Sequence, residues 1–151
     1  MVMVQRAGAY ARGANLILHA EALSTAGVGL HVLPVVMLPV TSPAPQVGAT
    51  ITTVVLAYRN DHPHPVDWKA FGAPFLRAAG VKSWRALHTE SRHCSIEKTP
   101  SVILLRPSRN GGVAGDDKGF HALEDHTITV DSNCTHEVLG AALLSALAQC
   151  R

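Results

Sequence analysis

The stretch VLGAALLSALAQC, residues 138–150, decides the class of fold. Its apolar residues recur at spacings of three and four, which is the period of a helix with one apolar face. The preceding Asp131, Ser132 and Asn133 are residue types that accept hydrogen bonds from the first free amides of a helix. The pattern therefore predicts a C-terminal amphipathic helix that docks on a sheet. Its expected apolar face consists of Val138, Leu139, Ala142, Leu143, Ala146, Leu147 and Cys150.

Short segments rich in apolar and β-branched residues, upstream of this helix, supply the strands of the sheet. Pro34 lacks a backbone donor, so it predicts a bulge or an edge strand. A chain of 151 residues suits one domain, 1–151, and the expected class is mixed α/β (α+β), a single sheet with packed helices. The predicted strands are residues 15–20, 29–38, 93–98, 101–106, 120–123 and 127–130, of which 93–98 and 101–106 form a hairpin.

The segment 46–59 fits two interpretations. Its ITTVV run at 51–55 favours a strand, whereas its apolar residues also follow the spacing of a helix, which we favour. The same segment resembles the C-terminal helix, because Gly48 aligns with Gly140 when residues 47–59 are placed on 139–151 without gaps. This alignment is consistent with a strand, cap and helix unit that occurs twice. Chance similarity between common small residues explains it equally well.

Two further helices are expected in the middle of the chain. Residues 60–65, NDHPHP, predict a surface connection, because each proline removes a donor and restrains the residue before it. A helix then begins after Asp67, a capping residue, and ends at Gly80, and a short helical turn follows at 83–87. Trp68 and Trp84 lie beside other apolar helix residues, so we expect both to be core anchors.

Composition limits the classes of function. A formal net charge of +2 is too small to predict binding to nucleic acid or to a membrane surface, and the apolar run 28–40 is too short and too interrupted to span a bilayer. Three cysteines without a CxxC pair predict free thiols in a reducing cytoplasm. The first residues contain no sustained apolar run of the kind found in signal peptides. We therefore expect a cytoplasmic protein.

A search for catalytic or cofactor motifs finds none that is specific. The densest group of possible metal ligands surrounds His62 and His64, but it lacks the helical or cysteine spacing of known sites, so no metal is expected. The glycines at 111–115 are not followed by the lysine of a phosphate loop. Cys94 beside His93 is expected to be a buried thiol rather than a nucleophile. We expect neither a catalytic residue nor a cofactor.

The polar, glycine-rich stretch 107–119 and the turn after it carry the best candidates for a binding site. Four carboxylates fall within ten residues there, in a chain with 11 acidic residues in total, and Lys118 lies among them while Arg109 precedes them. Such a patch is able to meet a basic partner, and a solvated face is the alternative explanation. The candidate residues are Arg109, Asp116, Asp117, Lys118, Glu124 and Asp125.

The order of several short motifs across residues 40–151 resembles the immunity proteins of contact-dependent growth inhibition systems. The motifs are the segment containing Gly48, His64-Pro65, Trp68-Lys69, Ser83-Trp84, Cys94-Ser95-Ile96-Glu97, Gly119-Phe120, Asp131-Ser132 and Leu139-Gly140-Ala141-Ala142-Leu143. The resemblance implies a cytoplasmic protein without chemistry of its own that binds the C-terminal toxin domain of a large effector and blocks its activity.

The resemblance carries over no contact residues, so the candidate interface rests on loop and charge alone. If the toxin is a nuclease, the acidic residues would occupy its cationic groove in place of phosphate. The alternative is a small hydrolase with an unrecognised His/Asp site. A concave pocket with convergent histidine and aspartate side chains would favour the hydrolase.

Overall fold

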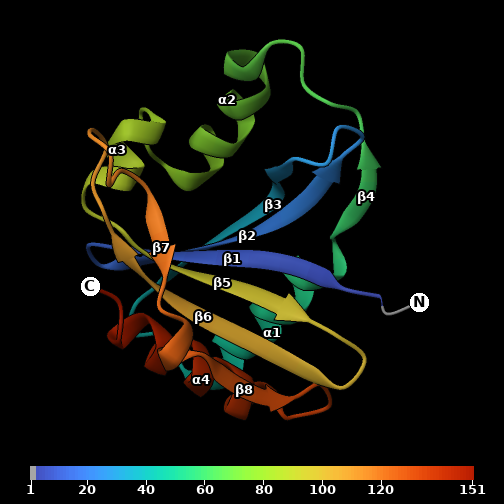
Figure 1. Ribbon diagram of the computed structural model, residues 1–151. Helices are drawn as coiled ribbons and strands as arrows, with labels where there is room; N and C mark the ends of the chain where they lie inside the picture. Colours follow the sequence, from blue (N-terminus) through green and yellow to red (C-terminus); the bar gives the residue numbers. More distant parts are fainter. Residues whose placement is uncertain (1–2) are drawn as a thin grey trace.

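The computed structural model describes residues 3–151 as one mostly antiparallel sheet with helices on both faces (Figure 1). The strands are β1 (Gln5–Arg12), β2 (Asn15–Ser24), β3 (Gly29–Pro39), β4 (Arg59–His62), β5 (Arg92–Lys98), β6 (Val102–Asn110), β7 (Phe120–Ala122) and β8 (Ile128–Asp131). The main order is β3-β2-β1-β5-β6-β7, with β8 antiparallel to β6 and β4 parallel to β2. This is the expected α+β class with a single sheet.

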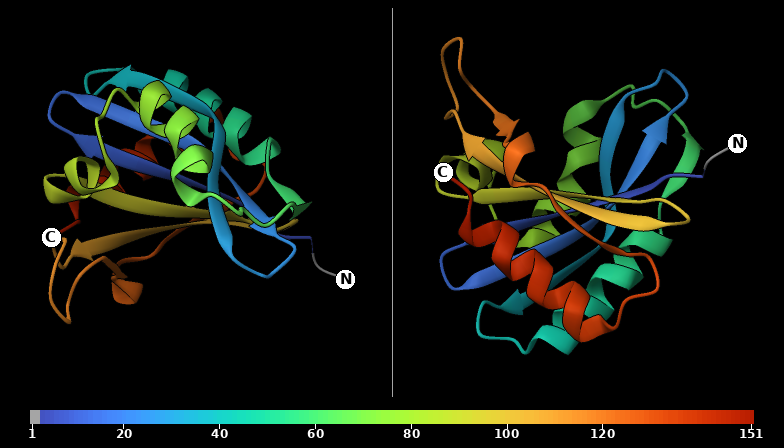
Figure 2. Two further views of the ribbon diagram at one scale, coloured as in Figure 1. Left: turned by 90° about the horizontal axis from the view of Figure 1, so that it is seen from above. Right: turned by 60° about the horizontal axis from the view of Figure 1, so that its bottom comes forward.

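The helices form two layers. α1 (Ala44–Leu56) and α4 (His136–Ala148) cover one face of the sheet, and α2 (Trp68–Ala79) and α3 (Trp84–Thr89) lie over the other (Figure 2). The C-terminal helix and the helical interpretation of residues 46–59 are both confirmed. α2 is continuous from Trp68 to Ala79 although it contains Pro74.

Alternation along the central strand β1 separates two cores. Ala7, Ala9 and Ala11 face α1 and α4 in the larger core, whereas Tyr10 belongs to a smaller core with Phe75 of α2. Successive side chains of a strand point to opposite faces, which is why one strand serves both cores. The small residues of β1 leave room for the two helices to pack closely on the sheet.

α1 and α4 cross at the two glycines that coincide in the internal alignment. A Cβ on Gly140 would overlap the carbonyl oxygen of Ala44 and lie 2.9 Å from the backbone nitrogen of Gly48. A Cβ on Gly48 would overlap the carbonyl oxygen of His136. The shared glycines are therefore contact points between the two helices. Each helix also follows a strand, β3 or β8, as the internal alignment predicts.

The structure corrects several sequence predictions. Residues 59–62 form β4, because β1 stops pairing with β2 at Ala20 and leaves the far end of β2 free. Strand β1 was not predicted. The N-cap of α4 is Thr135 and not one of the predicted residues 131–133. Asp131 instead ends β8, and its carboxylate accepts a hydrogen bond from Asn133 N. β6 continues to residue 110, so the polar loop begins later than expected. β3 is an edge strand, as Pro34 predicted, and it is only partly buried.

Candidate functional site

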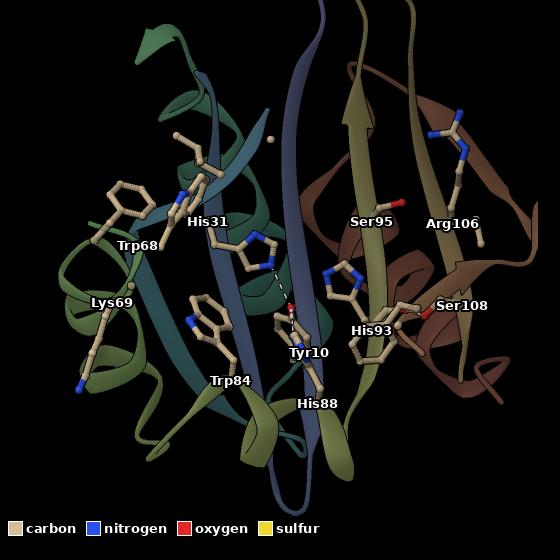
Figure 3. Close-up of a pocket in the computed structure, with 17 residues that line it drawn as sticks. Tyr10, His31, Trp68, Lys69, Trp84, His88, His93, Ser95, Arg106 and Ser108 are labelled. Carbon is tan, nitrogen blue, oxygen red and sulfur yellow. Dashed lines mark hydrogen bonds between the residues drawn. The ribbon is translucent and has the colours of Figure 1, made fainter. Parts of the chain in front are cut away.

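A cavity of about 840 Å³ lies on the sheet face opposite α1 and α4. The sheet forms its floor, α2 and α3 form one wall, and β7 lies on the other side (Figure 3). Eight of its 17 lining residues are aromatic or histidine, and the other polar ones are Lys69, Ser95, Arg106 and Ser108. The lining includes Tyr10, His31, Trp68, Trp84, His93 and Phe120.

Local sequence features hold α2 and α3 above the cavity. Asp67 accepts a hydrogen bond from Ala70 N at 3.1 Å, and Gly80 ends α2 in the left-handed conformation with φ of 70°, so both predicted caps are confirmed. A Cβ on Gly72 would lie 2.8 Å from Trp84 Nε1, so this glycine lets Trp84 pack beneath α2. Trp84 is partly buried and packs against the smaller core. Trp68 is 50% exposed at the cavity wall, so the core prediction for it is wrong.

Three histidines from three strands converge below the cavity. His19 lies on β2, His31 on β3 and His93 on β5, and one nitrogen of each lies within 4.8 Å of one nitrogen of each of the others. Figure 3 shows Tyr10 between His31 and His93, and its hydroxyl lies 2.9 Å from His31 Nε2. His19 has no exposed surface, whereas His31 and His93 are partly open to the cavity. We call these three residues the histidine cluster.

The histidine cluster is uncharged at neutral pH. Burial, followed by the proximity of the other histidines, lowers the pKa of His19 and of His93 to about 3, and lowers the pKa of His31 well below its usual value. His19 Nδ1 donates to the carbonyl oxygen of Ala20 at 3.1 Å, since a carbonyl can only accept. Its Nε2 therefore carries a free lone pair. Within residues 3–151, neither His19 Nε2 nor His93 Nε2 has a hydrogen-bond partner.

The predicted binding residues lie on one projecting part of the molecule, residues 109–125, which we call the charged segment. Figure 2 shows the connection between β6 and β7 extending away from the sheet. Arg109 forms two hydrogen bonds with Asp117, at 2.6 and 2.9 Å, and these lower the pKa of the Asp117 carboxyl. Glu124 lies 3.4 Å from Arg106. Two of the four predicted carboxylates are therefore already paired.

The remaining charges of this segment point to solvent. Asp116, Lys118 and Asp125 are exposed and form no ion pair with any other residue the structure describes. The charged segment also adjoins the cavity, because Gly119, Phe120 and Ala122 line it. The structure thus brings the predicted residues to the side of an apolar hollow that sequence reasoning missed. The members of the histidine cluster lie on separate strands with no shared motif, so no local signal identified them.

The other candidates from the sequence do not assemble into a site. Cys94 is fully buried against α1 and α4, and burial raises the pKa of its thiol, whereas its neighbour His93 faces the opposite side of the sheet. His62 and His64 belong to no group of three ligands in the described part of the chain. No carboxylate of residues 3–151 lines the cavity, so the His/Asp arrangement of a hydrolase is not present there.

Fold and site together define a small α+β protein with an aromatic hollow beside a charged projection, and comparison with known proteins identifies its family. The family model for CDI immunity protein, CdiI, matches residues 58–150, so the chain belongs to the CdiI family. No curated protein matches. None of the helices in residues 3–151 is long and apolar enough to cross a membrane.

Two solved structures share the fold. One is a protein of unknown function from Neisseria meningitidis, with a TM-score of 0.77, 19% identity, and coverage of 99% of this chain and 96% of that one. The other is from a CdiA-CT/CdiI toxin and immunity complex of Yersinia pseudotuberculosis, with a TM-score of 0.77, 11% identity, and full coverage of both chains. At these identities the likeness concerns the fold alone.

Proposed function

We propose that this immunity protein binds the C-terminal toxin domain of its cognate contact-dependent growth inhibition effector and neutralises it by covering the toxin's active site. Family membership supports the immunity role, and the Yersinia pseudotuberculosis relative was solved as a toxin and immunity complex. The observation that carries the proposal is the position of the charged segment beside an open aromatic hollow. Free thiols at all three cysteines are consistent with action in the cytoplasm.

The proposed binding face joins the mouth of the cavity to the charged segment. Tight interfaces place a few aromatic side chains in a central, desolvated region and surround them with a polar rim. Trp68 and Phe120 supply aromatic surface at the walls, and the charged segment supplies the rim. Contact with a toxin would cover both regions at once.

A nuclease is the toxin class that this face suits best. A nuclease attracts phosphate with a cationic groove, and carboxylates placed in that groove would compete with the substrate. Asp116 and Asp125 are free to do this without breaking an existing ion pair, whereas Asp117 and Glu124 are held by Arg109 and Arg106. The two unpaired carboxylates therefore carry the electrostatic part of the proposal.

The test combines rescue from the toxin with calorimetry on the purified pair. Cells that express the cognate toxin domain should survive only with this protein, and the pair should form a tight one-to-one complex. The double variant Asp116→Lys and Asp125→Lys should bind at least about 100-fold more weakly, because like charges facing each other cost several kcal/mol. The matched control reverses Asp61 and Glu137, which are exposed on β4 and α4, and should bind normally.

Three outcomes would count against the proposal. Failure of the wild-type protein to rescue the cells or to bind would reject the pairing with that toxin. Unchanged affinity in the double variant, with rescue intact, would reject the charged segment as an interface and leave the immunity role standing. Weakening of the same size in both variants would show that only net charge matters.

A further inference from the structure

We propose that the histidine cluster is a binding site for one divalent transition-metal ion, with Zn²⁺ as the representative ligand. His19, His31 and His93 would each supply one imidazole nitrogen, and a water molecule from the cavity would complete a four-coordinate site. The inference is independent of toxin binding, because it rests only on the arrangement of these three side chains.

The geometry of the cluster is close to that of a metal site. Three candidate ligand atoms lie within 4.8 Å of one another. A Zn–N bond of about 2.1 Å places tetrahedral ligand nitrogens roughly 3.4 Å apart, so nitrogens separated by as much as 4.8 Å would have to approach by about 1.4 Å. The rings now lie within 16° to 23° of parallel, with centroids 4.0 to 6.3 Å apart, and they would also turn to aim their lone pairs at one point. Rotation of an imidazole about its Cβ–Cγ bond is soft.

The histidines of the cluster also have the protonation state that metal binding requires. Metals bind neutral imidazole, and burial keeps these histidines uncharged at neutral pH. The hydrogen bond from His19 Nδ1 to a backbone carbonyl leaves the lone pair of Nε2 free to bind a metal, as is usual for histidines that are metal ligands. The Tyr10 hydroxyl is placed to fix the tautomer of His31 in the same way.

Two unpartnered nitrogens point to an absent ligand. His19 Nε2 and His93 Nε2 have no hydrogen-bond partner within residues 3–151, although His19 is fully buried. A buried acceptor without a partner destabilises the folded protein, and a bound cation would satisfy both nitrogens. The protein is therefore arranged as if a cation were shared between them.

The space between the two nitrogens depends on a glycine. A Cβ on Gly8 would overlap His19 Nε2 and lie 2.9 Å from His93 Nε2. Gly8 pairs with His19 across β1 and β2, and Tyr10, two residues further along β1, pairs with His93 across β1 and β5. With no side chain at position 8, the two rings approach each other across β1, from the strands on its two sides. An ion could enter from the cavity, since His31 and His93 line it.

The residue types indicate which ions fit. Three imidazoles suit Zn²⁺, Cu²⁺ and Ni²⁺, whereas Mg²⁺ and Ca²⁺ prefer carboxylate and carbonyl oxygen. Three histidines with an open fourth position can hold zinc with a water molecule. The ion would link β2, β3 and β5, and it would stabilise the folded protein because the unfolded chain has no preformed site.

The test uses tag-free protein stripped with EDTA. Calorimetry with Zn²⁺ should show one ion per chain with a Kd near or below 1 µM, and Co²⁺ should give the visible absorption of a four-coordinate site. Separate His19→Gln, His31→Gln and His93→Gln variants should each weaken binding at least about 100-fold. The control His136→Gln changes an exposed histidine and should bind like the wild type.

The proposal is overturned if folded wild-type protein binds no Zn²⁺ at 100 µM, or if folded cluster variants bind as well as the control. Where a variant does not fold, X-ray absorption of the Zn²⁺-loaded wild type decides. Three imidazole ligands at about 2.0 to 2.1 Å support the site, and two or fewer reject it.

Discussion

Substitution of Gly140 by alanine tests the closest contact in the fold. The added methyl group would overlap the carbonyl oxygen of Ala44 and lie 2.7 Å from its carbonyl carbon, where ordinary van der Waals contact begins at 3.4 Å. The obstructing atoms are backbone, so no side chain can rotate away. Relief of the contact with the carbonyl carbon alone requires α1 and α4 to separate by 0.7 Å, and relief of the closer contact with the oxygen requires more.

The cost follows from that separation. A gap of about 0.5 to 1 Å forfeits roughly a quarter to a half of the dispersion energy between facing atoms, and overpacking of a core costs about 1 to 3 kcal/mol or more. We take the upper end because the clash is with backbone. Replacement of glycine by alanine inside a helix returns about 1 kcal/mol. The net loss of unfolding free energy should be about 2 kcal/mol, which lowers Tm by about 4 to 8 °C.

Thermal unfolding followed by circular dichroism measures this shift. The control is Ser145→Ala, an exposed position in the same helix, which should raise stability by no more than about 0.5 kcal/mol. A Tm for Gly140→Ala equal to or above that of the control would refute the close crossing of α1 and α4. It would also remove the structural meaning of the internal alignment.

Two further predictions concern the cavity. In metal-free protein, acid should unfold the chain: His19 and His93 contribute stability above their unfolded pKa near 6.5 and lose it as pH falls towards about 3, at about 1.4 kcal/mol per pH unit each. Glu21, whose pKa burial raises to about 7, opposes one of them above about pH 4.5, and His31, whose pKa burial also lowers, adds to the loss. Urea unfolding should therefore show a net loss of at least about 1.4 kcal/mol from pH 6 to 5, and a flat profile would contradict the buried neutral histidines. Asp67→Ala removes the cap of α2 and should cost about 1 kcal/mol, with faster amide exchange in the first turn of α2 but not of α4; uniform exchange across the chain would contradict a local role.

Local chemistry made much of the fold predictable. The period of three and four in residues 138–150 predicted α4, and Asp67 with Gly80 marked both ends of α2. Pro34 correctly indicated an edge strand. Each of these signals acts within a few residues of the chain, where backbone donors, caps and side-chain period are decided.

Features that depend on distant neighbours were not predictable in this way. β4 forms because β2 has an unpaired end, and Trp68 is exposed because of where α2 lies over the sheet. The acidic patch also carries fewer unpaired carboxylates than the sequence suggested, because Asp117 and Glu124 are paired with arginines. Arg109 was known to lie near Asp117 in sequence, but their two-point pairing depends on how the connection after β6 folds back.

The sequence by itself determined the α+β class, the family, and the part of the chain that carries the exposed charges, because these follow from local patterns and from the order of short motifs. Only the tertiary structure decided that three histidines meet beneath an aromatic cavity and that this cavity adjoins the charged segment. The reason is physical. His19, His31 and His93 lie on separate strands, and they become neighbours only when β1, with Gly8 bare at its centre, is placed between β2 and β5.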